Sequence, residues 1–421
     1  MTFLSTHTTF LLPANTVDNR IDTVSSIVYT ENRLILRIYN PQNMKIPRIY
    51  DNLLEKSLQP NKAIIIFGPR QVGKTTLLND YLQKTKFKYR LDSGENARVA
   101  EIFDSQSFDK LFAYASGYEL IVIDEAQKIR NIGMGLKILI DHVPNIRIIA
   151  TGSSSFELAG QVGEPLVGRK NTINLYPISA KEYGQTLGNN YDLNKKLPDL
   201  LLFGSYPAVL TSTTKEEKIK TLNELADSYL FKDLLEFDRI KKSKVILDML
   251  RLLALQIGKE VSWSELGQKL GIDYKTVGRY LDLLEKAFVI ISLRGFSRNL
   301  RKEVTKKNKY YFYDTGIRNA IISNFNELPT RGDVGELWEN FLVVERIKTQ
   351  HYNSIYANNF FWRTWEQKEI DWLEERDGRL FGFEFKWGAH KYRPPKEFLK
   401  TYPEGEVTVI NKENYLPFLG C

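Results

Sequence analysis

The stretch Gly68-Pro69-Arg70-Gln71-Val72-Gly73-Lys74-Thr75 decides the fold of this 421-residue chain. It fits the pattern G-x-x-x-x-G-K-[ST], in which a glycine-bent backbone surrounds phosphate groups. An apolar run at 63–67 precedes it, and a helix-like segment at 76–82 follows it. A strand, a loop and a helix in this order predict a parallel α/β sheet of the P-loop NTPase type.

The residues of the loop have separate predicted roles. Gly68 and Gly73 let successive N–H groups converge on phosphate oxygens at the positive end of the following helix. Lys74 would neutralise the β and γ phosphates, and Thr75 would offer its hydroxyl to Mg²⁺. The predicted nucleotide-binding residues are Gly68, Pro69, Arg70, Gln71, Val72, Gly73, Lys74, Thr75 and Thr76.

Two further apolar runs end in polar residues. The run 120–123 is followed by Asp124 and Glu125, which resembles a Walker B strand: Asp124 would hold Mg²⁺ and Glu125 would orient the attacking water. The run 146–150 ends in Thr151-Gly152-Ser153-Ser154-Ser155, so hydroxyl groups should reach the same edge of the sheet. We predict that Ser153 senses the γ-phosphate; the alternative is a solvated loop.

Five segments carry a resemblance to a known family: GPRQVGKTTLL (68–78), IVIDEAQKI (121–129), ATGSSSFEL (150–158), PLVGRKNTINLYPISAKEY (165–183) and FGSYPAVL (203–210). They resemble the AAA-type ATPases of archaea and bacteria that carry a C-terminal domain of uncharacterised function, and the similarity runs over 46–416. The resemblance implies ATP as the nucleotide and ATP hydrolysis as the activity. It also places Arg169 where such ATPases have an arginine that reaches a neighbouring subunit's nucleotide, which implies a homo-oligomer. The alternative for Arg169 is an ordinary surface arginine.

The middle of the chain has a helix-turn-helix pattern. Residues 262–265 form a capping-box pattern at the start of a helix that ends at Leu270, and Asp273 can cap a second helix at 274–286. The apolar periodicity of that helix leaves Lys275 and Arg279 outside. Strands at 289–293 and 309–313 should flank a basic segment with Arg294, Arg298, Arg301, Lys302, Lys306 and Lys307. This pattern predicts a winged helix that binds DNA; a lid or a protein contact is the alternative.

A hairpin is expected near the C-terminus. Asp377-Gly378 suits a two-residue type I′ turn, and counting outward pairs Arg376 with Arg379, Leu373 with Gly382, and Asp371 with Glu384. Lys386 falls on the carboxylate face. The opposite face, with Phe381, Phe383 and Phe385, should be buried.

Two carboxylates and a lysine on one surface are what a Mg²⁺-dependent phosphodiesterase needs. Asp371, Glu384 and Lys386, together with Glu339 on a predicted helix, resemble the PD-(D/E)xK core of restriction-endonuclease-like domains, with Ile370 in place of the usual proline. The alternative is a cross-strand salt link without catalysis.

Length and composition suggest several globular domains. The chain is 43% hydrophobic and 26% charged. The expected divisions are 1–43, an extension that is a candidate for disorder; 44–185, the ATPase domain; 186–240, a helical lid or connector; 241–325, the winged helix; and 326–421, the nuclease-like domain. Met44 is a candidate natural start.

Charge and cysteine content limit the environment and partners. The single cysteine, Cys421, and the lack of a long apolar run indicate a cytoplasmic protein without a membrane segment. The net charge of +8 favours an anionic partner, although solubility alone could explain it. The four histidines show no zinc-ligand spacing.

These features together predict an ATP-driven switch. ATP and Mg²⁺ held by Lys74, Thr75 and Asp124 would order the sensor loop, and hydrolysis through Glu125 would release it and move the downstream modules. Nucleic acid, DNA first, is the expected partner. The alternative is an ATP-gated interaction protein that cleaves nothing.

Overall fold

The computed structural model describes residues 24–30, 33–38, 45–153, 163–228, 243–297, 307–364, 366, 368–388 and 395–421. The chain divides into two units, residues 1–44 and 45–421. In the first unit β1 (Val24–Thr30) and β2 (Arg33–Ile38) pair antiparallel. The remainder of the expected extension lies outside the described residues.

The predicted parallel sheet is present at the start of the second unit. Its strand order is β4-β5-β6-β3-β7, and every neighbouring pair is parallel. The strands are β3 (Lys62–Phe67), β4 (Tyr89–Ser93), β5 (Leu120–Asp124), β6 (Arg147–Gly152) and β7 (Lys170–Asn174). The inner strands are nearly continuous apolar runs because helices cover both faces of the sheet.

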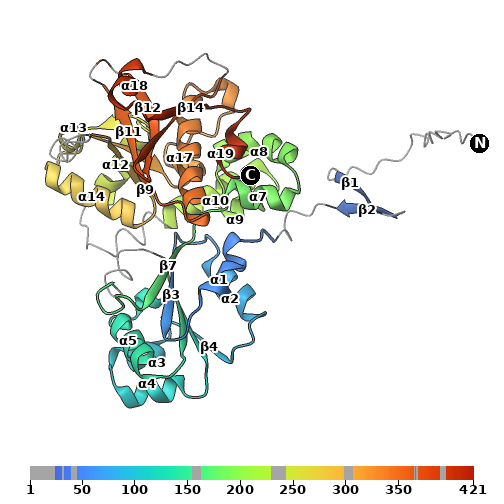
Figure 1. Cartoon of the computed structure of the whole chain (residues 1–421), viewed down its shortest axis with the longest axis vertical. Helices are drawn as coiled ribbons and strands as arrows, with labels where there is room; N and C mark the ends of the chain where they lie inside the picture. Colours follow the sequence, from blue (N-terminus) through green and yellow to red (C-terminus); the bar gives the residue numbers. More distant parts are fainter. Residues whose placement is uncertain are drawn as a thin grey trace, which may run out of the picture. The chain divides into compact units, whose positions relative to one another are not determined.

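The helices of this layer flank the sheet (Figure 1). On one side α3 (Ala97–Asp104), α4 (Phe108–Ala115) and α5 (Ile132–His142) share a buried core with β3, β5 and β6. On the other side lie α1 (Leu53–Ser57) and α2 (Lys74–Leu82). Since α2 begins at Lys74, the phosphate loop joins β3 directly to the first turn of a helix, as the sequence predicts.

Helices follow the sheet. They are α7 (Ala180–Leu187), α8 (Asn190–Phe203), α9 (Pro207–Leu210) and α10 (Lys215–Ser228). Both α8 and α10 contact α16 (Thr315–Ile321), which comes almost 90 residues later in the chain than α10. The expected connector therefore packs on the C-terminal region; its part from 229 to 240 lies outside the described residues.

The two helices and two strands predicted for the helix-turn-helix region form as α13 (Trp263–Leu270), α14 (Tyr274–Lys286), β9 (Ile290–Gly295) and β10 (Asn308–Phe312). Two further elements, α12 (Ser243–Ala254) and β8 (Glu260–Val261), were not predicted. Ser262 caps α13 by accepting a hydrogen bond from Glu265 N, and Asp273 caps α14 by accepting one from Thr276 N. Of the predicted basic segment, Arg294 and Lys307 are described, and Arg298, Arg301, Lys302 and Lys306 lie outside the described residues.

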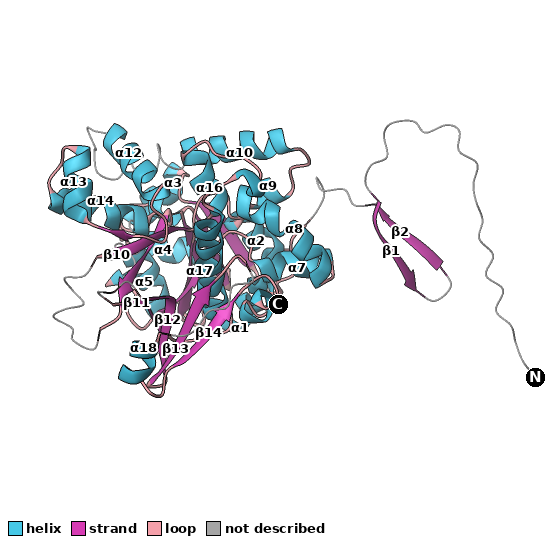
Figure 2. Cartoon of the chain, turned by 90° about the horizontal axis from the view of Figure 1, so that it is seen from above, coloured by secondary structure: helices cyan, strands magenta, loops and turns pink. Residues whose placement is uncertain are grey.

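One sheet crosses the boundary expected at 325/326. Its strand order is β14-β13-β12-β11-β9-β10-β8, and β9 pairs in parallel with β11 (Asn358–Arg363). The other C-terminal elements are η5 (Leu328–Thr330), α17 (Val334–Tyr352), β12 (Glu369–Arg376), β13 (Arg379–Phe385), α18 (Lys396–Thr401), β14 (Glu406–Ile410) and α19 (Tyr415–Phe418). Helix α17 runs along one face of the C-terminal strands (Figure 2).

The hairpin between β12 and β13 confirms part of the predicted register. Arg376 pairs with Arg379 and Leu373 with Gly382, and both turn residues, Asp377 (φ 51°) and Gly378 (φ 74°), have the positive φ of a type I′ turn. The predicted burial of the phenylalanines is wrong for two of them. Phe381 and Phe383 are partly exposed, and the face with Glu384 is buried.

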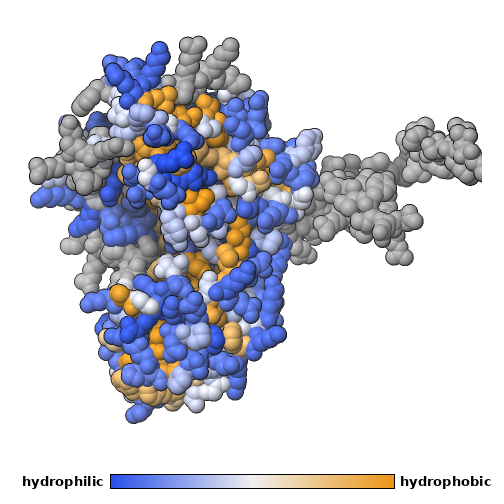
Figure 3. Space-filling view, viewed as in Figure 1, coloured by the Kyte–Doolittle hydropathy of each residue, from blue (hydrophilic) through white to orange (hydrophobic). Residues whose placement is uncertain are grey.

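The surface is largely hydrophilic in the view of Figure 3. Exposed hydrophobic residues include Phe108 and Phe112 of α4. Helix α4 lies at the lower end of the molecule in the orientation of Figure 1. Within the part of the chain that the structure describes, no helix is both long and apolar enough to cross a membrane.

Candidate functional site

The phosphate loop lies at the carboxyl edge of the parallel sheet. Gly73 has a left-handed backbone (φ 97°) and directly precedes α2, so the first turn of the helix opens onto the loop. Lys74 is 5% exposed, and its Nζ donates hydrogen bonds to Gly68 O and Pro69 O, each at 2.9 Å. The lysine therefore folds over its own loop, at the place where phosphates bind in such loops.

The predicted Mg²⁺ residues lie in contact. Thr75 Oγ1 donates to Asp124 Oδ2 at 2.7 Å, which joins the start of α2 to the end of β5. Thr151 Oγ1 donates to Asp124 Oδ1, and Glu125 N donates to Thr151 Oγ1 at 3.1 Å. Thr151, at the end of β6, therefore holds both Asp124 and Glu125 at the end of the neighbouring strand β5. A hydroxyl and a carboxylate are the hard oxygen ligands that Mg²⁺ takes beside nucleotide phosphates, so the residues present fit this ion.

Glu125 has a constrained backbone. Its φ and ψ are 49° and 42°, the left-handed region that a residue with a side chain rarely adopts. Gly94 allows this, because a Cβ at Gly94 would lie 2.3 Å from Glu125 O. Gly94 N also donates to Asp124 O at 2.7 Å, so the end of β4 fixes the carboxylate strand.

Gln127 was not predicted from the sequence, yet it connects the two predicted catalytic groups. Its Nε2 donates to a carboxylate oxygen of Glu125 and to Ser153 Oγ, the latter at 3.0 Å. The short helix η3 (Ala126–Lys128) turns Gln127 back toward the site, and both Gln127 and Ser153 are buried. Ser154 and Ser155 lie outside the described residues.

Arg169 lies at the other edge of the sheet. It directly precedes β7, so it is at the amino end of a parallel strand, whereas the phosphate loop follows the carboxyl end of β3. Arg169 Nε pairs with Asp141 Oδ1 at 2.6 Å, and the arginine side chain is 39% exposed. Its predicted role toward a neighbouring subunit's nucleotide stays a prediction.

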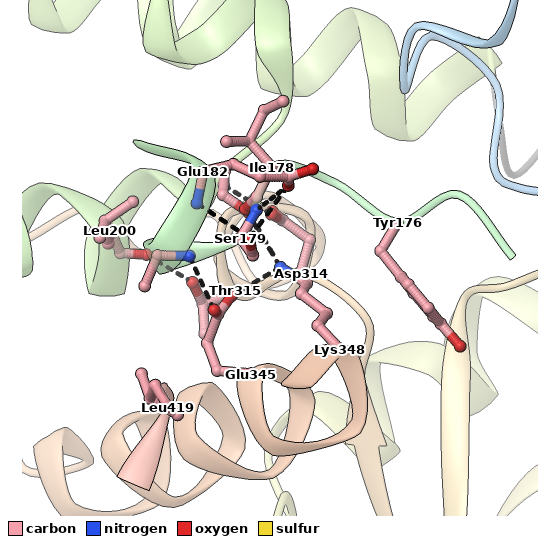
Figure 4. Close-up of polar contacts among 12 residues, drawn as sticks. Tyr176, Ile178, Ser179, Glu182, Leu200, Asp314, Thr315, Glu345, Lys348 and Leu419 are labelled. Carbon is pink, nitrogen blue, oxygen red and sulfur yellow. Dashed lines mark hydrogen bonds and ion pairs between the residues drawn. The ribbon is translucent and has the colours of Figure 1, made fainter. Parts of the chain in front are cut away.

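A buried polar network joins the nucleotide-binding layer to α17 (Figure 4). The segment after β7 leads to Ser179, which caps α7 in a capping box with Glu182. Ala180 N donates to Glu345 Oε2 at 2.7 Å, and Lys348 Nζ donates to Ile178 O at 3.2 Å. Glu345 and Lys348 both belong to α17, so two side chains of one helix hold the start of α7.

Arg48 extends this network to the phosphate loop. Its NH1 donates to Val72 O at 2.9 Å and its NH2 to Tyr176 O at 2.6 Å. Its Nε pairs at 3.1 Å with Glu182, which is fully buried. Tyr352 of α17 also donates to Glu182, at 3.4 Å. One guanidinium therefore contacts the nucleotide loop, the segment after β7 and a carboxylate that α17 also contacts.

The residues of the predicted nuclease-like core gather in one place, the acidic cluster. Asp371 Oδ2 accepts from Phe385 N at 2.8 Å, and Lys386 Nζ pairs with Glu384 Oε1 at 2.6 Å. Glu339 reaches the cluster from α17. The ladder between the described strands β12 and β13 ends at Trp372 and Phe383, so the predicted direct pair Asp371–Glu384 is not part of it. At the same place β12 has a bulge on its other side, with one extra residue between Ile370 and Leu373 relative to β11.

A buried lysine that was not predicted lies inside the acidic cluster. Lys309 Nζ is 3.2 Å from Glu339 Oε1 and 3.9 Å from Asp371 Oδ1, and it also pairs with Glu369 Oε1. Tyr311 OH donates to Glu339 Oε1 at 2.6 Å. Two residues of β10 therefore complete the cluster.

Burial controls the charges of the cluster. It raises the pKa of Asp371 well above its usual range, and the neighbouring Glu339 and Glu384 raise it further. Burial also raises the pKa of Glu384. For Lys309 burial alone would lower the pKa, but Glu339, Asp371 and Glu369 raise it above the ordinary value, so this lysine stays charged.

The acidic cluster does not fit a divalent cation. Among the described residues, no group of three or more histidine, cysteine, aspartate or glutamate side chains is placed to hold a metal ion. The ammonium of Lys309 lies between the carboxylates that would have to converge on such an ion.

The exposed side of α14 is polar and aromatic. Val277, Leu281, Leu284 and Phe288 are buried, whereas Lys275 and Arg279 are exposed, as the apolar periodicity of the helix predicts for these two. Tyr274 at the start of the helix is 55% exposed.

Comparison with protein families agrees with the geometry of the nucleotide site. Residues 60–184 match the AAA domain, residues 194–328 match a domain of unknown function (DUF8612), and residues 334–418 match another (DUF4143). The chain thus carries an AAA-type P-loop ATPase domain followed by two C-terminal domains of unknown function.

Two similar proteins have the name uncharacterised protein. A Mycobacterium tuberculosis protein is 28% identical over 336 residues, which cover 79% of this chain and 72% of the relative. A Methanocaldococcus jannaschii protein is 24% identical over 381 residues, covering 86% and 83%. Among solved structures, a STAND (Signal Transduction ATPase with Numerous Domains) protein with a tetratricopeptide repeat sensor from Pyrococcus horikoshii matches with a TM-score of 0.28 and 12% identity. The match covers 74% of this chain and 48% of that one, so the chain spans about half of its length.

Proposed function

We propose that this protein hydrolyses ATP and uses the cycle to move a C-terminal region that binds DNA. The observation that carries the proposal is the continuous hydrogen-bond network from Thr75 through Asp124 and Thr151 to Glu125. This network supports the proposal because it brings the phosphate loop, Asp124 and Glu125 together at one edge of the sheet.

The residues of this chain divide the work of hydrolysis. Lys74 would turn from Gly68 O and Pro69 O to the phosphates, and Thr75 and Asp124 would hold Mg²⁺, which neutralises charge on the β and γ phosphates. Glu125 would orient the attacking water, and Gln127 keeps its carboxylate in place. Ser153, bonded to the same glutamine, is the proposed sensor of the γ-phosphate. Arg169 is proposed to complete a neighbouring subunit's site in a homo-oligomer.

ATP turnover of the wild type and of Glu125→Gln, each with and without duplex DNA, tests this function. We expect Glu125→Gln to reduce turnover about 10²- to 10⁴-fold, the usual effect of losing a general base, and to leave ATP binding intact. Calorimetry that finds no binding of ATP at millimolar concentration to the folded wild type would contradict the proposal.

DNA binding is proposed for the helix-turn-helix region. The arrangement of α12 to α14 with β8 to β10 supports a winged helix, whose second helix would lie in the major groove. Lys275 and Arg279 are exposed on that helix, where they can contact phosphates.

Replacing each cation by alanine tests the DNA-binding surface. Each replacement should weaken duplex binding and lower the salt slope by about 1. Lys286→Ala is the control, because Lys286 lies at the other end of α14 and pairs with Asp282. Equal effects of all three replacements would reject this surface.

The resemblance also implies a nuclease, because Glu339, Asp371, Glu384 and Lys386 gather in one cluster, but the ammonium of Lys309 among these carboxylates counts against a bound Mg²⁺. Incubation of DNA and Mg²⁺ with the wild type and with Asp371→Ala separates the two functions. Cleavage by the wild type but not by Asp371→Ala supports the nuclease. Cleavage by neither protein supports an ATP-gated binding protein.

A further inference from the structure

The acidic cluster is completed by a cation from another part of the chain. The carboxylates of Glu339, Glu369 and Asp371 come from α17 and β12, whereas Lys309 comes from β10, beside the helix-turn-helix. We infer that the ammonium of Lys309 takes the place of the divalent cation of a nuclease core, so that this core binds no metal and joins two regions of the chain instead.

Hydrogen-bond donors already occupy one oxygen of Glu339 and one of Asp371 in the cluster. Glu339 Oε1 accepts from both Lys309 and Tyr311, and Asp371 Oδ2 accepts from the backbone of Phe385. An ammonium has three donors, which suit carboxylates at hydrogen-bond distance. Mg²⁺ needs near-octahedral oxygens at about 2.0–2.1 Å, so it cannot enter while the lysine is present.

The lysine is held by backbone as well as by charge. Lys309 pairs with Leu293 of β9 on one side and with Glu260 of β8 on the other. Its side chain is 1% exposed, and Nζ lies 5.4 Å from the centre of the Phe361 ring. Withdrawing it would break two strand ladders and leave charged carboxylates buried without a counter-ion, which is costly.

One oxygen of the cluster shows where a metal could enter once the lysine is removed. Glu384 Oε2 is buried, and none of the described residues is hydrogen-bonded to it. Replacing Lys309 by an apolar side chain would remove the cation nearest to Glu339 and Asp371, while Lys386 would stay paired with the other oxygen of Glu384. If the lysine occupies the position of a metal ion, a mutation that removes the lysine should therefore allow a metal ion to bind there.

The test measures Mn²⁺ binding to the full chain without nucleotide, so its outcome does not depend on the ATPase proposal. Lys309→Met should bind one more Mn²⁺ than the wild type, and Asp371→Asn added to it should remove the gain. Lys307→Met, an exposed lysine two residues away, is the control and should gain none. Lys309→Met should also melt below the wild type in a chelator and recover in millimolar Mn²⁺.

Measurements on the wild type show whether the acidic cluster binds a metal ion, even if Lys309→Met does not fold. Asp371→Asn and Glu384→Gln should leave the Mn²⁺ stoichiometry of the wild type unchanged. A wild-type Mn²⁺ site that either replacement removes overturns the inference, and so does a folded Lys309→Met that gains no Mn²⁺.

Discussion

At the scale of single residues, Gln127 holds the carboxylate of Glu125, which we propose orients the attacking water. It donates to both Glu125 and Ser153, so we predict that Gln127→Leu frees the carboxylate and lowers ATP turnover by roughly 10- to 100-fold. Affinity for ATP should stay nearly unchanged, because Gln127 has no part in the phosphate loop. Steady-state turnover together with calorimetry measures both quantities.

A matched control separates this effect from general loss of an amide. Gln83→Leu changes an exposed glutamine at the end of α2 and should leave turnover as in the wild type. If Gln127→Leu weakened ATP binding as much as it lowered turnover, Gln127 would support the structure of the site as a whole rather than position the Glu125 carboxylate.

The sequence predicts residues of the nucleotide site only where they belong to a motif in which the functional residues have a fixed spacing. The phosphate loop and the pair Asp124–Glu125 have such spacing, and the structure places Thr75 on Asp124 as the motif requires. Gln127 lies two residues after Glu125 and faces the site only because η3 turns the chain back. Periodicity gives no signal for such a turn.

Asp333 links stability to acid pH. Burial alone would raise the pKa of Asp333, but hydrogen bonds from Arg331 and Arg318 lower it from 3.8 to about 2. A lowered pKa stabilises the folded state above the unfolded pKa, and the stabilisation is lost as the pH falls from 3.8 to about 2.

The expected size of this effect is about 2 kcal/mol. Asp333→Asn should be less stable than the wild type at pH 7, and the difference in free energy of unfolding should shrink by that amount between pH 5 and pH 2. Urea unfolding at several pH values measures it. A difference that stays constant over this range would show that Asp333 keeps an ordinary pKa.

At the scale of elements, the continuous sheet predicts which fragment folds. Residues 326–421 alone would leave β11 without its partner β9 and the acidic cluster without Lys309. We therefore expect this fragment to unfold without a cooperative transition, whereas residues 243–421 should melt cooperatively. Circular dichroism during heating distinguishes the two, and a cooperative melt of 326–421 would contradict the role given to β9 and Lys309.

The hairpin shows how far register can be predicted. The Asp377-Gly378 turn determines the pairs nearest to it, and these are confirmed. The predicted pairs stop matching the structure near Asp371, where β12 has a bulge relative to β11. The hairpin turn carries no information about such a bulge, because the bulge involves the strand on the other side of β12. Lys309 could not be found in this way, since its contact with Asp371 depends on tertiary packing of β10 rather than on any local pattern.

At the scale of the whole second unit, Arg48 is a contact through which we expect the nucleotide state to influence α17. It bonds the carbonyl of Val72 in the phosphate loop and pairs with Glu182, to which Tyr352 of α17 also donates. Movement of the loop around a bound nucleotide must therefore shift or break bonds of this guanidinium. Lysine at this position keeps the charge but lacks the planar fork that reaches several acceptors at once.

Hydrogen exchange of α17 tests this coupling in the Glu125→Gln background, where ATP stays bound. We predict that ATP changes the exchange of α17 amides, and that Arg48→Lys removes this response while ATP binding persists. Lys45→Met is the control, because Lys45 makes only an exposed pair with Asp80 among the described residues, and such pairs contribute about 0–1 kcal/mol. If α17 responds equally in Arg48→Lys and in the control, the signal reaches the C-terminal region by another path, such as the bond from Ala180 N to Glu345.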